Sequence, residues 1–247
     1  MRTFKELLER VAAVQGVPFA ELAAAHGIQW SAEPSRNKGL AGRIVEAAMG
    51  LPANPRQEAD LSHLGLEIKT VPVGPGLKVL EMTKITMLNF QDVADHPFEG
   101  SNVEHKLRSI IFVPVMKLEP DRPDQWYIRS PFIWFPSNAA YRQLKRDYES
   151  VREIIRAGDV ERISSKRPPD GQGVFMTANT AGRDSRDETS YFLEEERRRE
   201  VVSKRRAWML RKDFTAEILR ENIAYTPLPP ERTAVTSALA TAAPRFE

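Results

Sequence analysis

The sequence contains no cysteine and no long apolar run. Without cysteine the chain has no disulfide bond and no thiolate ligand for zinc, which fits a reducing environment. No apolar stretch approaches the roughly 20 residues that a membrane-spanning helix needs. The first residues open directly into an expected amphipathic helix, without the segments of a secretory signal. We therefore expect a cytoplasmic protein that does not contact a membrane.

The chain also has little net charge. Lys and Arg number 36 against 34 Asp and Glu, a formal net charge of +2. This excludes a strongly basic protein that binds nucleic acid through overall charge alone. An anionic partner would have to bind local patches, of which residues 197–212 form the most basic. Within it, Arg197–Arg199 could contact phosphate, or could form ion pairs on a helix with the acidic residues at i,i+3 and i,i+4.

A chain of 247 residues is long enough for one sizeable α/β domain. Helix and strand patterns mix along it, without an internal repeat. We expect one domain with two lobes. The expected helices cover residues 3–15, 18–25, 38–49, 101–108, 137–157, 191–204 and 214–223, and the expected strands cover residues 64–72, 79–88, 109–116, 127–135, 173–178 and 206–211.

One short segment combines two carboxylates and a lysine. In residues 66–70 (Leu-Glu-Ile-Lys-Thr), apolar and polar side chains alternate with the period of a strand. Glu67 and Lys69 therefore share one face, and Asp60 precedes them in a D-x6-E-x-K pattern that is typical of nucleases. The alternative is a solvated strand face without chemistry, because acidic and lysine residues are common on surfaces.

The residue types of this segment suit phosphodiester hydrolysis. Mg²⁺ is a hard cation that takes oxygen ligands, which Asp60 and Glu67 would supply. A bound ion polarises the scissile phosphate and activates a water molecule. Lys69 would orient that water or stabilise developing negative charge. Because a protonated lysine is a poor base at neutral pH, we favour the electrostatic role.

Motifs on both sides of this segment resemble one family of DNA-cleaving enzymes. Residues 38–46 follow K-G-x-x-G-x-x-x-E, and Glu67 begins E-x-K-T-x-P-V. Downstream elements are V-E-H-K-L-R at 103–108, R-S-P-F-I-W-F-P at 129–136 and L-R-K-D-F-T at 210–215. In order and spacing these elements resemble the MutH mismatch-repair endonucleases and the related GATC-cleaving type II restriction enzymes.

The resemblance implies an α/β fold with a restriction-endonuclease-like core, in which helices flank a mixed sheet and two lobes surround a DNA cleft. It implies Mg²⁺-dependent DNA hydrolysis, with Mn²⁺ able to substitute. Asp60 and Glu67 would be metal ligands, Lys69 the catalytic lysine and Glu46 a further acidic residue of the centre. The residues implied to contact DNA are Lys38, His105, Lys106, Arg211 and Lys212.

Some of these DNA contacts have a structural alternative. Ser101 and Glu104 have the spacing of a capping box, which would explain a short helix around His105 and Lys106 without any function. Lys38, at the entry to a helix, could equally be an ordinary surface residue. For Lys38, His105 and Lys106, a contact with DNA and a purely structural role both stay open. For Arg211 and Lys212, contact with a DNA phosphate is favoured.

The chain departs from the family where the DNA sequence would be read. A family tyrosine at the recognition site falls at Met209, and a family arginine-proline-lysine run aligns with Val174–Met176. An arginine that binds guanine through two hydrogen bonds contributes about 1–3 kcal/mol of discrimination. Arg183 or Arg186 could substitute for the missing basic residues. The resemblance thus supports the catalytic centre better than a specificity for GATC.

The resemblance also suggests how the chain is divided. Residues 1–224 would form the endonuclease domain, followed by a flexible tail at 225–247. A loop rich in charge, Gly and Pro at 165–190 is expected to be mobile. Within the domain we expect an N-terminal helical part at 1–30, a catalytic core at 38–164 and a recognition lobe at 165–224.

Two functions share this chemistry. The first is incision of one strand of double-stranded DNA in mismatch repair, activated by a MutL-like partner. The second is restriction cleavage of both strands, paired with a cognate methyltransferase, and the departures at the reading positions suit it because they favour a site other than GATC. A third function, a DNA-binding module without activity, is opposed by the presence of Asp60, Glu67 and Lys69.

Overall fold

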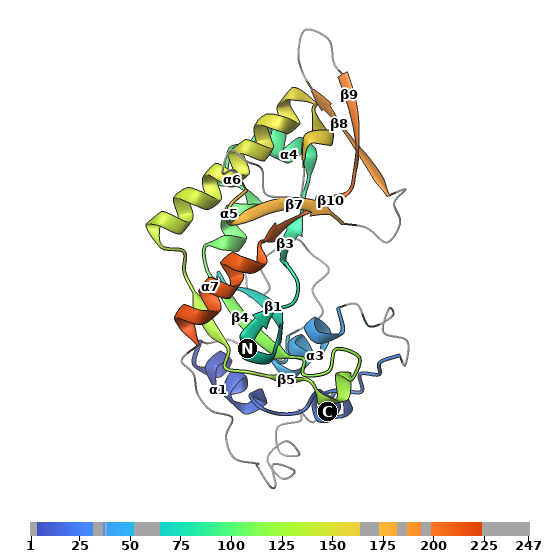
Figure 1. The fold of residues 1–247 in the computed structure, drawn as a ribbon, viewed down its shortest axis with the longest axis vertical. Coiled ribbons are helices and arrows are strands. Elements are labelled where there is room, and N and C mark those ends of the chain that lie inside the picture. The colour runs from blue at the N-terminus through green and yellow to red at the C-terminus, as the bar shows by residue number, and fades with distance from the viewer. Residues whose placement is uncertain are drawn as a thin grey trace, which may run out of the picture.

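The computed structural model describes residues 4–31, 37, 39–51, 65–163, 173–181, 187–193 and 199–223. In these ranges the elements form two groups along the long axis of the molecule, a lower and an upper group in Figure 1. Helices flank a mixed sheet, which confirms the α/β class expected from the sequence. None of the helices in the described ranges is long and apolar enough to cross a membrane.

A five-stranded mixed sheet lies in the lower group. Its central strands, β1 (Glu67–Gly74) and β4 (Ile110–Met116), pair in parallel from Glu67 opposite Ile110 to Val73 opposite Met116. β4 is buried at every position, as expected for a continuous apolar strand inside a sheet covered on both faces. The other strands are antiparallel to these two: β2 (Lys78–Val79) beside β1, and β5 (Tyr127–Ile128) and β6 (Phe132–Trp134) beside β4.

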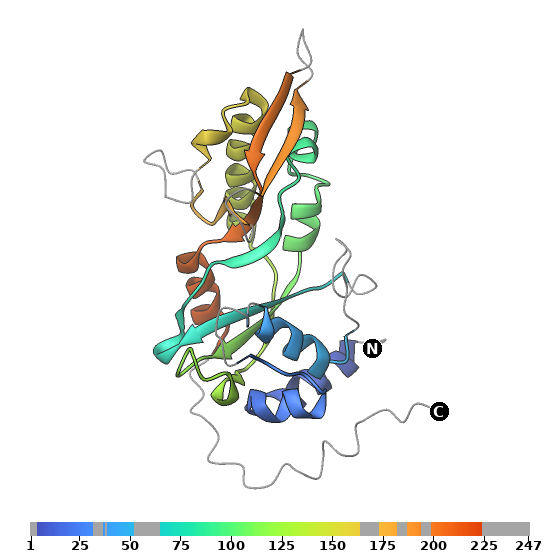
Figure 2. The same ribbon diagram turned by 90° about the vertical axis from the view of Figure 1, so that its right-hand side faces the viewer.

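The two faces of this sheet belong to two separate hydrophobic clusters. Along β4, Ile110 and Phe112 pack in one cluster, whereas Ile111 and Val113 pack in the other. On β1, Ile68 faces the second cluster, so Glu67 and Lys69 share the opposite face, as the sequence predicted. The second cluster is covered by the N-terminal helices shown in blue in Figure 2, α1 (Phe4–Val14), α2 (Phe19–Ala25) and α3 (Leu40–Ala48).

The upper group contains a three-stranded antiparallel sheet and a two-stranded hairpin (Figure 1). The sheet has the order β3 (Thr83–Met87), β10 (Arg206–Leu210), β7 (Met176–Thr180), and the hairpin pairs β8 (Glu188–Leu193) with β9 (Arg199–Lys204). Helices α4 (Phe90–Asp95), α5 (Asn102–Leu107) and α6 (Asn138–Ala157) pack beside these strands. The last helix, α7 (Lys212–Asn222), follows β10 of the upper sheet directly and contacts β2 and β6 of the lower sheet, so it connects the two groups.

The helix expected at 191–204 is wrong. This stretch contributes to β8 and β9, which pair from Glu188 opposite Lys204 to Leu193 opposite Arg199. Burial alternates there: Tyr191 and Leu193 are buried, as the period of a strand requires. The charge spacing that suggested ion pairs on a helix was therefore misleading, and the part of this stretch at 194–198 lies outside the described residues.

Two expected strands are each divided, and one helix was not expected. The strand at 79–88 separates into β2 and β3, which belong to different sheets. The strand at 127–135 separates into β5 and β6, with Pro131 in the gap where a backbone donor is missing. α4 was not predicted, although Asn89 caps it by accepting a hydrogen bond from the Asp92 backbone N–H at 3.2 Å.

Asp147 of α6 holds the segment that leads into β7. The side chain is fully buried, and its carboxylate accepts backbone hydrogen bonds from Val174 at 3.1 Å, Phe175 at 2.7 Å and Met176 at 2.8 Å. The Gln143 amide donates a fourth bond at 2.7 Å. Bonds to an ionised acceptor are stronger than neutral ones, so one side chain fixes this backbone.

We predict that Asp147→Asn destabilises the protein. The amide N–H₂ group would face backbone donors, and each buried donor left unpaired costs about 1–3 kcal/mol of unfolding free energy. Chemical denaturation measures the change. Glu153→Gln, an exposed change on the same helix, is the control and should leave stability unaltered. Equal stability of the two variants would contradict the anchoring role.

Candidate active site

Glu67 lies at the centre of a buried ionic cluster. The residue is only 2% exposed, and its Oε1 atom accepts hydrogen bonds from Lys69 Nζ at 2.6 Å and from Lys106 Nζ at 3.1 Å. Its Oε2 atom accepts from Lys106 Nζ at 3.0 Å. A buried charge is tolerated when it is paired and hydrogen-bonded, as this carboxylate is. The structure therefore brings together Glu67 and Lys69, which the sequence pattern joined, and Lys106, which only the family resemblance suggested.

The strand pairing explains why these three side chains meet. Glu67 stands opposite Ile110, the first residue of β4, and α5 ends at Leu107 just before that strand. The Glu67 N–H also donates to the Ser109 carbonyl at 3.1 Å, which holds the start of β1 against this turn. Lys106, in the last turn of α5, is thereby placed over the face of β1 that carries Glu67.

The capping interactions of α5 are present as well. Ser101 Oγ accepts from the Glu104 N–H at 3.1 Å, while the Glu104 carboxylate accepts from the Gly100 N–H at 2.7 Å and from the Tyr141 hydroxyl at 2.9 Å. Burial, together with the bond to Glu104, raises the pKa of Tyr141 to about 12, so this hydroxyl remains a donor. The capping box that stabilises α5 is therefore present together with the contact between Lys106 and Glu67, and one does not exclude the other. His105, in contrast, is exposed.

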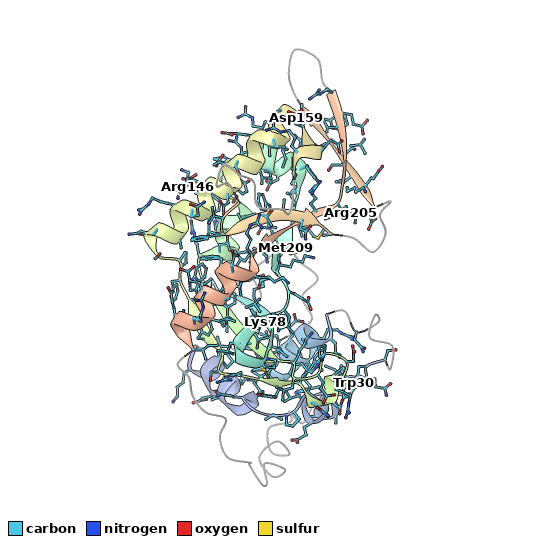
Figure 3. All side chains as sticks on the ribbon, viewed as in Figure 1. Trp30, Lys78, Arg146, Asp159, Arg205 and Met209 are labelled. Atoms are coloured by element: carbon cyan, nitrogen blue, oxygen red, sulfur yellow. The ribbon has the colours of Figure 1, made fainter. Side chains whose placement is uncertain are left out.

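A pocket of about 800 Å³ opens beside β1. Within the described residues, β2 pairs with β1 only at Val73 and Gly74, so the edge of β1 near Lys69 is not covered by a paired strand. Side chains from both groups of elements line the pocket. They include Glu46 of α3, Lys69 and Thr70 of β1, Thr83 and Lys84 of β3, and Trp30, which Figure 3 labels.

Glu46 reaches this pocket from the helix-covered side of the sheet. The residue is half-buried on α3, and a Cβ atom placed on Gly42 would lie 3.9 Å from Glu46 Oε1 and 4.0 Å from Thr70 Oγ1. The carboxylate therefore lies close to β1, next to the residue that follows Lys69. Glu46 and Lys69, selected from separate motifs, line the same cavity.

The remaining acidic residue and one basic residue cannot be placed, since Asp60 and Lys38 lie outside the described residues. The described part of the chain contains no group of three or more side chains able to hold a metal ion. It does pair Glu67 with Lys69, and it places Glu46 in the wall of the pocket that Lys69 also lines. The carboxylate oxygen atoms of the two glutamates are of the type that Mg²⁺ prefers, so the donor chemistry fits a magnesium ion if Asp60 completes the set.

Arg211 and Lys212 bind other parts of this chain. Arg211 is buried and its guanidinium donates to the carbonyl of Gly173, while its N–H donates to the Phe175 carbonyl at 2.9 Å. Lys212 Nζ donates to the Leu80 carbonyl at 2.9 Å. These bonds tie β10 and α7 to neighbouring loops, and contact of either residue with DNA stays a prediction.

Sequence reasoning did not select Lys84, although it lines the pocket with Lys69. Burial of part of the side chain, together with the charge of Lys69, lowers the pKa of Lys84. No motif identifies this residue, because a single lysine in a strand is common. Only the folding of β3 against β1 brings it to the pocket.

Comparison with known proteins gives a family match. Residues 49–147, which include β1, α5 and β4, match the family described as DNA mismatch repair enzyme MutH. The matched stretch contains Asp60, Glu67, Lys69 and Lys106 and ends at Asp147.

Several curated relatives are similar over most of the chain. The DNA mismatch repair protein MutH of Shewanella woodyi is 31% identical over 188 residues, or 76% of this chain and 79% of that protein. The protein of the same name from Actinobacillus pleuropneumoniae serotype 3 is 31% identical, covering 91% and 96%. That of Haemophilus influenzae is 30% identical, covering 92% and 99%. The chain belongs to the MutH family of DNA mismatch repair enzymes.

Proposed function

We propose that this protein is a metal-dependent endonuclease that incises one strand of DNA in mismatch repair. Family membership supports the coarser statement, a DNA mismatch repair endonuclease. The observation that carries the finer proposal is that Lys69, paired with the buried Glu67, lines the same pocket as Glu46. An ordinary solvated strand face would not bury its carboxylate between two lysines.

Asp60 and Glu67 would hold a Mg²⁺ or Mn²⁺ ion, with Glu46 as a third carboxylate near it. When bound, the ion supplies Lewis acidity at the scissile phosphate and activates a water molecule. Glu67 has both oxygens engaged by lysines in the described structure. Binding of the ion would therefore take over at least one of these contacts, and the released ammonium group would face the DNA.

Lys69 is placed to act on the phosphate. Its side chain is 17% exposed, against 8% for Lys106, and of the two it is the one that lines the pocket. A fixed ammonium group costs no reorganisation when negative charge develops on the phosphate oxygens. Lys106 lies behind Glu67 and would orient the carboxylate rather than contact the DNA.

The substrate would be double-stranded DNA held between the two groups of elements, with the pocket at its cleaved phosphate. A MutL-like activator suits incision in mismatch repair. A restriction enzyme paired with a cognate methyltransferase is the second candidate. Met209 and Val174–Met176 favour it, because they replace the family's reading residues, whereas the names of the relatives favour mismatch repair.

We expect the protein with Mg²⁺ or Mn²⁺ to nick plasmids at hemimethylated GATC sites on the unmethylated strand. Unmethylated, hemimethylated and fully methylated plasmids are compared, and strand ends are mapped by sequencing. Cleavage should stop in EDTA and return with the metal. Double-strand breaks at another motif would show a restriction enzyme instead. Absence of cleavage with every metal would contradict both enzymatic functions.

We expect Asp60→Ala and Lys69→Ala each to abolish cleavage while the fold remains intact. Loss of a group that stabilises transition-state charge lowers kcat by about 10²–10³-fold. Single-turnover cleavage measures the rate, and thermal unfolding checks the fold. Lys78→Ala, an exposed lysine on β2, is the matched control and should cleave normally. A Lys69 variant as fast as this control would show that the proposed centre is wrong.

A further inference from the structure

Lys84 occupies a position between the catalytic pocket and the strand on which the family's recognition tyrosine would fall. It lies on β3, where it pairs with Met209 of β10. Figure 3 labels Met209 in the region where the upper and lower groups meet. On its other side, Met209 pairs with Thr177 of β7. Lys84 also lines the pocket that contains Lys69 and Glu46, so it borders both regions.

The charged residues of the pocket can be sorted by their partners. Glu81 lies 4.0 Å from Lys117 Nζ, and Asp124 accepts from Arg122 at 2.8 Å. In the part of the chain that the structure describes, no hydrogen bond or ion pair neutralises the Lys84 ammonium group. Among these described residues, the positive charge of Lys84 therefore has no paired carboxylate.

The nearest electrostatic influence on Lys84 is unfavourable. The pKa of Lys84 is lowered mainly by partial burial of its side chain and further by the positive charge of Lys69. Two ammonium groups facing one pocket repel each other unless an anion lies between or beside them. Lys69 is paired with Glu67, and within the described residues no carboxylate hydrogen-bonds to Lys84, so a phosphate of bound DNA is an anion that this ammonium group can take.

We propose that Lys84 binds a phosphate of the DNA backbone adjacent to the phosphate held at Lys69. This inference rests on the proposed function, which supplies DNA as the anion. A phosphate contact fixes the position of the duplex and adds affinity, but it reads no base. Lys84 thereby contributes DNA affinity beside Met209, at a place where the chain lacks the family's reading residue.

The dependence of DNA binding on salt tests this contact. Each phosphate neutralised by a protein cation contributes about 0.9 to the slope of log K against log salt concentration on B-DNA. We expect Lys84→Ala to make this negative slope shallower by about 0.9 and to weaken DNA binding about fivefold at 0.15 M salt. Lys84→Arg should retain both. Fluorescence anisotropy of the full chain on a hemimethylated GATC duplex in EDTA measures them.

Lys5→Ala serves as the control, because Lys5 is a highly exposed lysine on α1 that faces Glu9. Its slope should equal that of the wild type. Because Lys84 is exposed on an edge strand, we expect thermal unfolding to show that all variants are folded. Wild-type binding and cleavage together with an unchanged slope for Lys84→Ala would overturn this inference alone. A wild type that neither binds nor cuts DNA would contradict the proposed function as well.

Discussion

The parallel pairing of β1 with β4 is the constraint on which the candidate active site depends. Glu67 and Lys106 are 39 residues apart in the sequence, and they meet because Glu67 aligns with the first residue of β4 directly after α5. A shift of one residue would turn Glu67 and Lys69 toward the helix-covered face and place Ile68 beside Lys106. The apolar faces of both strands oppose that shift, so core packing maintains the geometry of the charged cluster.

Buried polar contacts hold the other half of the molecule in the same way. The Asp147 carboxylate accepts hydrogen bonds from the backbone N–H groups of residues 174–176. Arg211 donates to the carbonyls of Gly173 and Phe175 in the same segment. The segment where the family carries basic reading residues is therefore anchored through its backbone. The hydrogen bonds to Asp147 use backbone N–H groups, so they do not depend on the side chains of Val174, Phe175 and Met176, although proline, which has no N–H, could not donate there.

Part of the candidate site could be predicted from the residues alone, since Glu67 and Lys69 follow from strand alternation, whereas Glu46 was selected through the family resemblance. Lys106 needed the family resemblance, and its contact with Glu67 depends on a pairing that no local pattern encodes. Lys84 had no signal at all, because only tertiary packing brings β3 to the pocket. The helix expected at 191–204 failed for a related reason: its charge spacing is local, whereas the hairpin of β8 and β9 is stabilised by pairing between strands.

The proposed function requires that Glu67 is a ligand of a metal ion in a centre shared with Glu46, Asp60 and Lys69. Anomalous diffraction from crystals of the Lys69→Ala variant grown with Mn²⁺ and a hemimethylated GATC duplex tests it directly. We expect an anomalous peak within coordination distance of carboxylate oxygens of Asp60 and Glu67, next to a DNA phosphate. A peak bound elsewhere, with Glu67 still held by Lys106 alone, would contradict it.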